Sequence, residues 1–378
     1  MIRVAEVLYE PAHSGQAVHV LALAEHLDRS RFSLVVCYPA WDYRMRDRLA
    51  ELGVEGRPWP MRRWINFVPA MALCRLIRSQ AIDILHVHGQ FAGLWARPAA
   101  KLVGASVVYT PHTIYIRQKR LQSAYWLAER LLGRLTDRLI SVCEADRRLV
   151  VAAGWIRDNR AITVHNGLDW SKWDTYTRDR LAARRKLGWP ADQPSILQIG
   201  RLDAQKAPAD LLEVATLVRN EMPAVHFYLA GDGPLRHSLE TRIHAAGLAE
   251  TVILLGQRFD VPTLLAACDL VTLTSAWEGL PYSLLEAAAM GRPAVCTAVD
   301  GCPEVVFNGE TGYTVPPGKL EAMAQAILRL LKQPNLAEEM GRLALTRARQ
   351  SFDVRRMVNA IATVYEEVIA ERKKSELR

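Results

Sequence analysis

The chain alternates between two kinds of segment over almost its whole length: apolar runs with the pattern of a buried β-strand, and longer runs with the periodicity of a helix. The strand-like runs lie at residues 2–8, 32–37, 82–87, 106–110, 138–142, 161–164, 195–199, 225–229, 251–255, 269–274 and 294–298. Alternating strands and helices build parallel sheets that carry helices on both faces. The pattern therefore predicts an α/β fold with two doubly wound, largely parallel sheets and a cleft between them.

Length and one change in composition indicate where the chain divides. At 378 residues it is too long for one typical domain and suits two. Residues 166–194 begin with the turn-forming pair Asn166-Gly167 and continue with charged residues, glycine and proline. We expect an N-terminal domain at residues 1–165, a linker at 166–194 and a C-terminal domain at 195–352.

The positive charge is concentrated in the first half. Residues 1–175 contain 24 Lys and Arg against 16 Asp and Glu, whereas residues 176–378 contain 24 of each, so the net charge of +8 belongs to the first half. Such a half favours contact with an anionic surface, such as lipid headgroups or nucleic acid; a merely basic domain is the alternative. No apolar run reaches the roughly 18–20 residues of a membrane helix. We expect a cytoplasmic protein, peripheral at the inner face of the membrane.

The segment 276–289 (AWEGLPYSLLEAAA) combines two acids with the pattern of a loop and a helix. It follows a strand-like run, and Glu278 lies in the loop ahead of Pro281, whereas Glu286 lies within the helical part. Open α/β sheets bind ligands at the carboxyl ends of their strands, and a helix N-terminus presents free N–H groups there. Two carboxylates at such a place suit a ligand rich in hydroxyl groups. Alternatively, Glu278 is a loop charge and Glu286 a solvated helix residue, although apolar residues flank Glu286.

Two cations follow the first strand-like run of the second half. Arg201 and Lys206 lie five residues apart in a loop that precedes a helix. Two cations at a helix entrance form an anion site well suited to a diphosphate. An unrelated pair of surface cations is the alternative on spacing alone.

Histidines and a glycine follow strands of the first half. His112 comes directly after the run 106–110, where site residues collect in this architecture, or it is a loop histidine bonded to backbone. Gly15, in the turn after the first strand, allows a phosphate or sugar to approach the backbone, and ordinary turn chemistry explains it equally. His86 and His88 share one side of a strand, as metal ligands do, but no acidic or cysteine partner is near them in the sequence. We therefore expect no metal there.

Residues 117–134 place basic residues beside apolar and aromatic ones. Arg117, Lys119 and Arg120 precede Tyr125 and Trp126 in a helical pattern. This arrangement is found in helices that lie at a membrane surface. It also fits a helix that packs on its own core with a basic outer face, which is the interpretation we favour.

Four stretches together resemble the retaining glycosyltransferases of family four, which have the GT-B architecture. They are HNGLD at residues 165–169, GRLDAQK at 200–206, GDGPLR at 231–236 and EGLPYSLLEA at 278–287. The resemblance covers nearly the whole chain, with the motifs in the family's order and spacing. Two positions depart from the family pattern. Ser14 precedes Gly15 where many members have a double glycine, and Ala207 follows the lysine where many have glycine.

The resemblance implies two Rossmann-like domains, the C-terminal one holding a nucleotide-activated sugar and the N-terminal one mostly holding the acceptor. The last helix, at residues 353–378, would cross back to the first domain. The implied co-substrate is a nucleoside diphosphate-sugar, commonly UDP-linked, with no metal ion, other cofactor or nucleic-acid partner. The implied acceptor is a saccharide, a lipid-linked sugar or a cell-surface glycan precursor.

The resemblance also implies a role for each candidate residue. Arg201 and Lys206 would bind the diphosphate and stabilise the leaving nucleotide. Glu286 would bind the ribose hydroxyls, and Glu278 would contact the donor sugar as a binder rather than a nucleophile. His112 would lie beside the transferred sugar. The other implied donor contacts are Gly15, Gln257, Arg258, Gly279, Leu280, Pro281, Ser283 and Leu284.

The expected activity is therefore the transfer of a sugar from a nucleoside diphosphate to an acceptor, with retention of anomeric configuration. Breaking the anomeric C–O bond develops negative charge on the diphosphate, which fixed cations stabilise. A sugar-nucleotide epimerase or a phosphorylase on the same fold is an alternative, and so is a binding protein without turnover. A dinucleotide oxidoreductase is disfavoured, because no GxGxxG follows the first strand.

Overall fold

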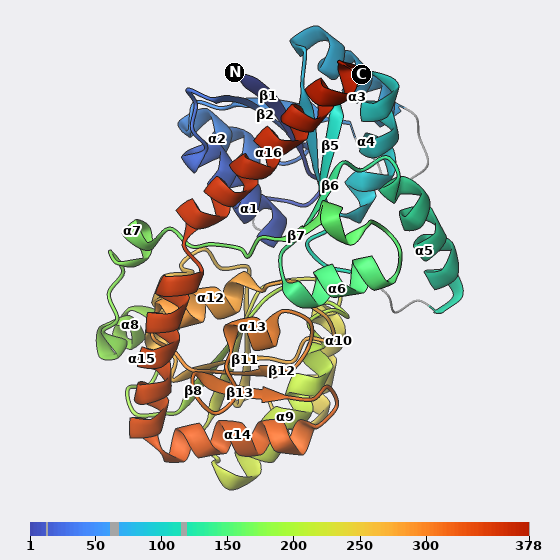
Figure 1. Ribbon diagram of the computed structural model, residues 1–378. Coiled ribbons are helices and arrows are strands. Elements are labelled where there is room, and N and C mark those ends of the chain that lie inside the picture. Colours follow the sequence, from blue (N-terminus) through green and yellow to red (C-terminus); the bar gives the residue numbers. More distant parts are fainter. Residues whose placement is uncertain (13, 61–67, 115–118, 378) are drawn as a thin grey trace. The chain divides into compact units, whose positions relative to one another are not determined.

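The computed structural model describes residues 1–12, 14–60, 68–114 and 119–377 (Figure 1). The chain divides into two compact units. The first unit comprises Met1–Gly167 and Val354–Arg378, and the second comprises Leu168–Asp353. Arg117, which belongs to the basic segment predicted at residues 117–134, lies outside the described residues.

The first unit is built on a seven-stranded parallel sheet in the order β3-β2-β1-β4-β5-β6-β7. The strands are β1 (Ile2–Val7), β2 (Phe32–Pro39), β3 (Glu55–Trp59), β4 (Ile84–His88), β5 (Ser106–Thr110), β6 (Arg138–Ser141) and β7 (Ala161–Thr163). The helices are α1 (Gly15–His26), α2 (Tyr43–Glu51), α3 (Val68–Gln80), α4 (Gln90–Leu102), α5 (Lys119–Gly133), α6 (Glu144–Ala152) and α16 (Val354–Glu376), with a short 3₁₀ turn, η1 (Asp158–Arg160).

The second unit is built on a six-stranded parallel sheet in the order β10-β9-β8-β11-β12-β13. The strands are β8 (Ser195–Ile199), β9 (His226–Ala230), β10 (Val252–Gly256), β11 (Leu270–Leu273), β12 (Ala294–Thr297) and β13 (Gly312–Val315). The helices are α7 (Trp170–Trp173), α8 (Arg180–Leu187), α9 (Pro208–Glu221), α10 (Arg236–Ala245), α11 (Val261–Ala267), α12 (Tyr282–Ala289), α13 (Cys302–Val305), α14 (Leu320–Lys332) and α15 (Pro334–Ser351). Both units thus have the doubly wound α/β architecture expected from the alternation of segments.

Helix α16 is the last element of the chain, yet it belongs to the first unit. Its residues Ile361 and Tyr365 are fully buried in one apolar cluster with Ile84 of β4, Val108 of β5 and Ile140 of β6. Figure 1 shows the helix lying across this sheet. Burial of such a face drives the return of the chain to the first sheet.

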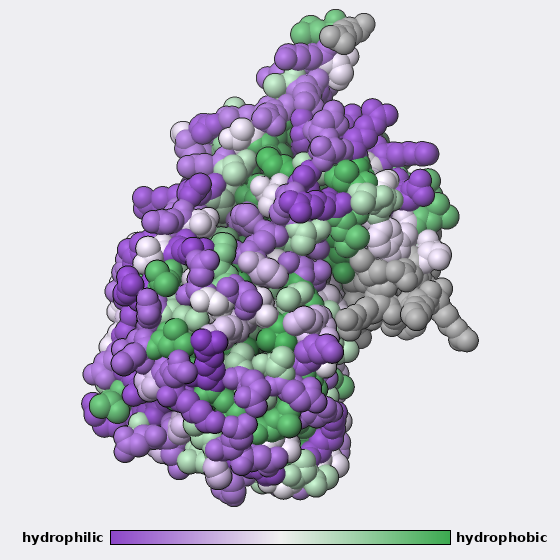
Figure 2. All heavy atoms as spheres, turned by 60° about the horizontal axis from the view of Figure 1, so that its bottom comes forward, coloured by the Kyte–Doolittle hydropathy of each residue, from purple (hydrophilic) through white to green (hydrophobic). Residues whose placement is uncertain are grey.

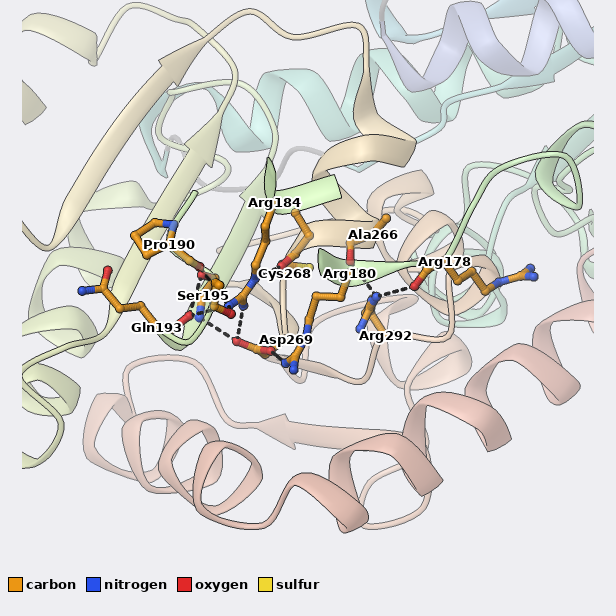
Figure 3. Close-up of polar contacts among 12 residues, drawn as sticks. Arg178, Arg180, Arg184, Pro190, Gln193, Ser195, Ala266, Cys268, Asp269 and Arg292 are labelled. Atoms are coloured by element: carbon orange, nitrogen blue, oxygen red, sulfur yellow. Dashed lines mark hydrogen bonds and ion pairs between the residues drawn. The ribbon is translucent and has the colours of Figure 1, made fainter. Parts of the chain in front are cut away.

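Residues 168–194, which the composition indicates as part of a linker, contain α7 and α8 and belong to the second unit. Arg184 of α8 anchors them (Figure 3). This buried guanidinium donates hydrogen bonds to the carbonyl groups of Ala267, Pro190, Ala191 and Gln193 and to Asp269 at the amino end of β11. The polar composition of residues 168–194 therefore reflects a segment that a buried arginine holds at the amino end of β11, rather than a solvated segment.

No helix within the described ranges has both the length and the apolar character needed to cross a membrane. In Figure 2 hydrophilic side chains predominate on the visible face, with apolar ones scattered among them or gathered beside the residues drawn in grey. Helix α5 contributes exposed apolar residues: Leu127 and Leu131 are more than half exposed. Its Tyr125 and Trp126 instead pack edge-on against Trp155 of the core, as the favoured interpretation of this segment predicts.

Candidate active site

The order of strands reverses between β8 and β11 in the second unit. From β8 the chain proceeds outward through β9 and β10, and from β11 it proceeds through β12 and β13 in the other direction. The two helix connections on either side of such a switch leave the carboxyl ends of the central strands uncovered, so ligands bind there. The loops that follow β8 and β11 carry the cations Arg201 and Lys206 and the acid Glu278, respectively.

Lys206 and Glu278 form an ion pair across this switch point. The Lys206 ammonium lies 2.5 Å from Oε1 of Glu278, with side chains only 15% and 4% exposed. The same Oε1 accepts a hydrogen bond from the Ser275 hydroxyl at 2.5 Å, and Gln205 donates a longer one, 3.4 Å, to Oε2. An oxygen that already accepts two hydrogen bonds is a poor nucleophile, so the geometry suits Glu278 to binding and charge balance. One cationic partner also satisfies a carboxylate that burial would otherwise penalise.

Asp203 organises the loop that carries both cations. Its Oδ2 accepts a hydrogen bond at 2.5 Å from Nε of Arg201, while its Oδ1 accepts from the backbone N–H groups of Gln205 and Lys206. One carboxylate thereby holds the Arg201 side chain and the Lys206 backbone in a fixed relation. Arg201 remains more than half exposed, which leaves guanidinium surface for an anionic ligand.

The backbone of this loop is close-packed and locally strained. A Cβ at Gly200 would lie 2.9 Å from Cε of Lys206, so the lysine stem passes directly over the glycine. Ala207, the residue after the lysine, has φ +42° in the left-handed region. Glycine adopts this conformation without the Cβ clash. The left-handed backbone at residue 207 explains why many members of the family that this sequence resembles have glycine there. Ala207 adopts the same backbone at some cost in free energy.

The loop after β11 is held by the next loop of the sheet. The Glu278 N–H donates to Oδ2 of Asp300 at 2.7 Å, and the Gly279 carbonyl accepts from the N–H of Gly301 at 3.1 Å. Asp300 itself has φ +42°, a conformation that a residue with a Cβ adopts only when its surroundings fix it. Backbone hydrogen bonds at Glu278 and at the next residue, Gly279, therefore hold the loop that carries the acid.

Helix α12 begins directly after this loop, with Pro281 as its N-cap. The N–H of Leu284 donates to the Pro281 carbonyl, but no described residue accepts from the N–H of Tyr282 or Ser283. The Ser283 hydroxyl and the Tyr282 phenol are also buried without a described partner. Leu280, just before the helix, is buried. Unsatisfied donors at a helix N-terminus form a site for an anion or for sugar oxygens.

Glu286 lies in the second turn of α12, partly exposed and surrounded by apolar neighbours. Burial raises the pKa of its carboxyl to about 8, because the charged form is poorly solvated there. Within the described part of the chain no group donates a hydrogen bond to it. A desolvated carboxyl with unused acceptor sites is a typical binding-site residue.

Gln257 and Arg258 follow β10, two strands away from β8 on the same edge of the sheet. Arg258 forms a two-fold ion pair with Asp260, at 2.8 and 2.6 Å, and Gln257 is exposed. No described hydrogen bond joins either residue to the Lys206–Glu278 pair. Gln257 and Arg258 therefore lie at the same edge of the sheet as the Lys206–Glu278 pair, but they form no described hydrogen bond with it.

The first unit has its own polar cluster at the corresponding switch point, between β1 and β4. Glu6 of β1 accepts hydrogen bonds from Nε2 of His88 at 2.6 Å and from the Tyr365 hydroxyl at 2.7 Å. Nδ1 of His88 lies 2.9 Å from Nε2 of His112. His86 lies 2.6 Å from the Tyr365 hydroxyl. His112 is a candidate site residue from the sequence, and the structure joins it to a buried network that spans β1, β4, β5 and α16.

Burial decides the protonation of this cluster. It lowers the pKa of His88 to about 4 and that of His112 well below its ordinary value, so both imidazoles are neutral at pH 7. Burial also opposes the charge of Glu6, but the contacts with His86 and His88 outweigh it and hold the pKa of this carboxyl below its ordinary value. At neutral pH Glu6 is therefore charged, whereas His88 and His112 are neutral.

Gly15 is the exposed first residue of α1, the helix that carries His19. Ser14 caps the helix, its hydroxyl accepting from the Ala17 N–H at 3.2 Å. The serine that replaces the family's first glycine thus supplies a cap that glycine cannot. One turn further, the ring of His19 meets the ring of His112 edge-on, with 5.0 Å between centroids. Gly15 and His112 therefore belong to one region of the first unit.

Glu6 supplies the acidic partner that His86 and His88 lack in the sequence, because β1 pairs with β4. These three residues are a group that could hold a cation. However, Glu6 and His88 are in direct hydrogen-bond contact at 2.6 Å, and His86 lies 3.1 Å from the same oxygen. The atoms that would ligate a metal are thus engaged with one another.

Sequence reasoning missed the residues that hold the candidates in place: Glu6, His19, Asp203, Gln205, Ser275 and Asp300. Asp203 and Gln205 lie within the GRLDAQK stretch, but no spacing in the sequence marks the role of any of the six. Asp203 and Asp300 gave the only available signal, since each is an acid in a loop after a strand. The contacts of Glu6 depend on which strands are neighbours in the sheet.

The chain matches two known families. The family described as "Glycosyltransferase Family 4" matches residues 13–172, and the family described as "Glycosyl transferases group 1" matches residues 179–347. The two matches cover most of the chain and meet near the boundary between its units.

Individual relatives and solved structures show similarity at modest identity. The UDP-Gal:alpha-D-GlcNAc-diphosphoundecaprenol alpha-1,3-galactosyltransferase of Escherichia coli is 26% identical over 306 residues, which are 79% of this chain and 79% of that protein. The N-acetyl-alpha-D-glucosaminyl L-malate synthase of Bacillus anthracis is 28% identical over 316 residues, 82% and 81% of the two chains. The crystal structure of Anabaena HepE in complex with UDP-glucose covers 97% of this chain and 100% of its own, with a TM-score of 0.86 at 22% identity. The structural likeness shows the GT-B fold, with its two Rossmann-like domains, and the family matches show that the chain belongs to the group 1, family four glycosyltransferases.

Proposed function

We propose that this glycosyltransferase moves a sugar from a UDP-sugar to an acceptor with retention of anomeric configuration, and that it needs no metal ion. The observation that carries the proposal is the buried Lys206–Glu278 pair at the switch point of the second sheet. It places a cation and an acid beside the unsatisfied N-terminus of α12. The E. coli relative, which is named for UDP-Gal, and the HepE structure, which contains UDP-glucose, support the choice of nucleotide.

The second unit supplies the donor site in this proposal. Lys206 keeps two of its three N–H donors for the diphosphate, and the exposed guanidinium of Arg201 adds a second cation. The free N–H groups at the start of α12 meet phosphate or sugar oxygens. Glu286 accepts hydrogen bonds from the ribose hydroxyls, and Gln257 and Arg258 lie toward the base.

The proposed chemistry follows from these charges. As the anomeric C–O bond breaks, the sugar gains oxocarbenium character and the electron pair passes to the diphosphate oxygen. Lys206 and Arg201 stabilise that negative charge in place of a metal ion. The acceptor hydroxyl attacks from the face that the diphosphate leaves, and the leaving phosphate takes its proton. Glu278, held by Lys206 and Ser275, positions the donor and balances charge.

The first unit supplies the acceptor side, with His112 beside the transferred sugar. The E. coli relative acts on a sugar linked to diphosphoundecaprenol, according to its name. We propose a lipid-linked or cell-surface glycan precursor as the acceptor of this chain. Epimerisation, phosphorolysis and binding without turnover are the alternative functions.

The experiment that tests the proposed function is a transfer assay in EDTA. UDP-sugars are incubated with a panel of acceptors, including polyprenyl-diphosphate-linked sugars, and the product is identified by mass spectrometry and its anomeric configuration by NMR. We expect an α-linked product from an α-linked donor, formed only when an acceptor is present. Product formed without acceptor favours an epimerase, and stoichiometric binding without turnover over the whole panel favours a binding protein.

A surface of α5 supports attachment to a membrane. Leu127, Arg130 and Leu131 are exposed, and their spacing puts them on one face of α5, and Arg134, just after the end of the helix, is exposed as well. Alternating leucine and arginine on one face is typical of a helix that lies at an anionic membrane surface. The net charge of +8 in the first half acts in the same direction.

Liposome sedimentation tests this attachment. Wild-type protein should bind vesicles that contain anionic lipid, less as salt increases, and the Arg130→Glu, Arg134→Glu variant should bind them less. The matched control is Arg355→Glu, Arg356→Glu, two exposed arginines on α16. Binding that ignores both lipid charge and salt contradicts the proposed attachment.

A further inference from the structure

A continuous chain of hydrogen bonds runs from α16 to His112 inside the first unit. The Tyr365 hydroxyl donates to Oε1 of Glu6, and Nε2 of His88 lies 2.6 Å from Oε2 of the same carboxylate. Nδ1 of His88 then lies 2.9 Å from Nε2 of His112. Glu6 and His88 are fully buried and His112 is 7% exposed, so water does not interrupt the chain.

This series of hydrogen bonds determines which ring nitrogen carries the proton in His88 and in His112. A carboxylate only accepts, so His88 must donate through Nε2–H to Glu6. A neutral imidazole carries one proton, so Nδ1 of His88 is bare and must accept. The proton of the next contact therefore comes from His112, whose Nε2–H donates to His88. The remaining nitrogen of His112, Nδ1, is left as a bare acceptor.

His86 forms a side branch that does not disturb this assignment. Its Nδ1 lies 2.6 Å from the Tyr365 hydroxyl and 3.1 Å from Glu6, and its Nε2 lies 2.8 Å from the Thr110 hydroxyl. Nδ1–H of His86 donates to these oxygens, and Nε2 bonds the Thr110 hydroxyl, which can donate or accept. The branch ends at Thr110 and does not reach His112.

The orientation of the His112 ring is also restricted. Its backbone has φ +64°, which a residue with a Cβ adopts only when surrounding contacts hold it there. His19 meets the ring edge-on at 5.0 Å, and His88 holds its Nε2. Within the described part of the chain no group hydrogen-bonds Nδ1 of His112.

We propose that Glu6 and His88 are positioning residues that hold His112 as its Nε2–H tautomer and so present Nδ1 as a hydrogen-bond acceptor to a hydroxyl group of the transferred sugar. The proposal rests on the proposed function for the identity of that ligand. The tautomer itself rests on the contacts of the first unit alone. Glu6 acts through His88, and neither of the two touches the sugar.

The test reads the tautomer directly. Protein labelled with ¹⁵N-histidine is measured in solution at pH 7, and His112 is assigned by the signals lost in His112→Gln. We expect Nε2 of His112 to show the shift of a protonated nitrogen and Nδ1 that of a bare one. A wild-type protein with a proton on Nδ1 overturns the proposal without any further variant.

Two substitutions of His88 separate positioning from packing. In His88→Gln the new side-chain amide must donate to Glu6, which leaves its carbonyl oxygen to accept from His112, so the wild-type tautomer should remain. His88→Leu fills similar space without either contact, so both tautomers of His112 should be populated, and kcat should fall about tenfold, as expected for one lost hydrogen bond. The glutamine variant should recover most of that loss. Equal His112 signals in the leucine variant and the wild type overturn the proposal.

Thr110→Val is the matched control, because it removes a hydrogen bond of the same buried network on the His86 branch. Its His112 signals and transfer rate should match the wild type. Calorimetry should show that His88→Leu binds UDP as tightly as the wild type does. If the leucine variant shifts the tautomer without changing transfer, the role in catalysis is overturned. If the wild type transfers no sugar from any UDP-sugar, the proposed function fails while the tautomer measurement still decides the assignment.

Discussion

Glu286 combines a raised pKa with unused acceptor oxygens. The pKa of its carboxyl is about 8, so much of it carries a proton at neutral pH in the unliganded protein. Hydroxyl groups of a bound ribose would stabilise the charged form, because a carboxylate accepts their hydrogen bonds. In the proposed donor site, binding of UDP and loss of this proton are therefore linked.

The linkage predicts a pH-dependent affinity. As pH rises from 6 to 8, wild-type protein should bind UDP more tightly relative to Glu286→Gln, by up to about tenfold for each pH unit below the pKa. Calorimetric titration of both proteins at three pH values measures the ratio, and the variant cancels the titration of UDP itself. A ratio that does not change with pH contradicts the assignment of Glu286 to the ligand.

The same group predicts how stability depends on pH. Because the folded pKa of about 8 exceeds the ordinary value of 4.5, the folded protein holds a proton that the unfolded chain releases. The free energy of unfolding should therefore fall as pH rises between 4.5 and 8, on the order of a few kcal/mol, reduced by the partial exposure of the side chain. Glu286→Gln should lack this fall. Urea denaturation at pH 5 and pH 8.5 measures it, and an equal fall in the variant would refute the burial of Glu286 as its cause.

Ala207 predicts a gain in stability. Its left-handed backbone costs a residue with a Cβ about 1 kcal/mol, and glycine's greater freedom in the unfolded chain offsets part of the relief. Ala207→Gly should raise the free energy of unfolding by about 0.5 kcal/mol. The control is Ala209→Gly, two residues on within α9, which should lower it by about 1 kcal/mol. A loss at both positions would show that the strain at Ala207 is not relieved.

The candidate site shows what a sequence can predict at the residue scale. That Lys206 and Glu278 each lie in a loop after a strand could be predicted, whereas their ion pair depends on β8 and β11 being neighbours, which the structure shows. The contacts of Asp203 with Arg201 and of Asp300 with Glu278 could not be predicted. They depend on the conformations of loops in which Ala207 and Asp300 have positive φ. The link from Glu6 to His112 requires the side-chain directions of two strands.

At the scale of single elements, α8 shows how charged sequence becomes part of a folded unit. Arg184 is almost fully buried, and its partners are four carbonyl groups and the carboxylate of Asp269. A buried cation is tolerated only when such partners surround it. Arg184 therefore fixes the helix to the amino ends of β8 and β11.

This anchoring predicts a contrast between two arginines that share a partner. Arg184→Met should lower the free energy of unfolding by about 3–5 kcal/mol, because Asp269 and several carbonyl groups lose a buried donor. Arg180, half exposed, pairs with the same Asp269, and Arg180→Met should cost less than about 1 kcal/mol. Chemical denaturation of both variants measures the difference. Equal losses would mean that α8 is not held through Arg184.

The same elements explain which parts of the fold could be predicted. Strands β5 and β8 coincide with their predicted limits because both are central, apolar and bounded by turn residues. Strand β3 was missed because Glu55–Trp59 contains glycine and proline, which only an edge strand tolerates. Strand β13 was missed because its four residues follow a glycine turn and have no repeating pattern. Helix α8 was hidden by its charged composition.

For the whole molecule, two separate cores carry the two sheets. Ile361 of α16 is buried in the first unit, and Ile327 of α14 is buried in the second. Each core is assembled from its own strands and helices, so damage to one should not spread through side-chain packing to the other.

Hydrogen exchange can test this division. Ile361→Ala should destabilise the first unit by about 2–5 kcal/mol and speed exchange in β1, β4 and β5. Ile327→Ala, its counterpart in the second unit, should speed exchange in β8, β11 and β12 instead. Equal acceleration in both sheets for either variant would show one cooperative unit rather than two.

The most direct test of the donor site is a calorimetric titration of UDP in EDTA into wild-type protein and into Lys206→Met, Glu278→Gln. The double substitution removes the cation together with its buried acid, so no charge is left unpaired in the folded protein. We predict that the variant unfolds at a temperature close to that of the wild type but binds UDP about 100-fold more weakly, the loss expected for charge-assisted hydrogen bonds to a diphosphate. A folded variant that binds UDP as tightly as the wild type would contradict the assignment of the nucleotide to this edge of the second sheet.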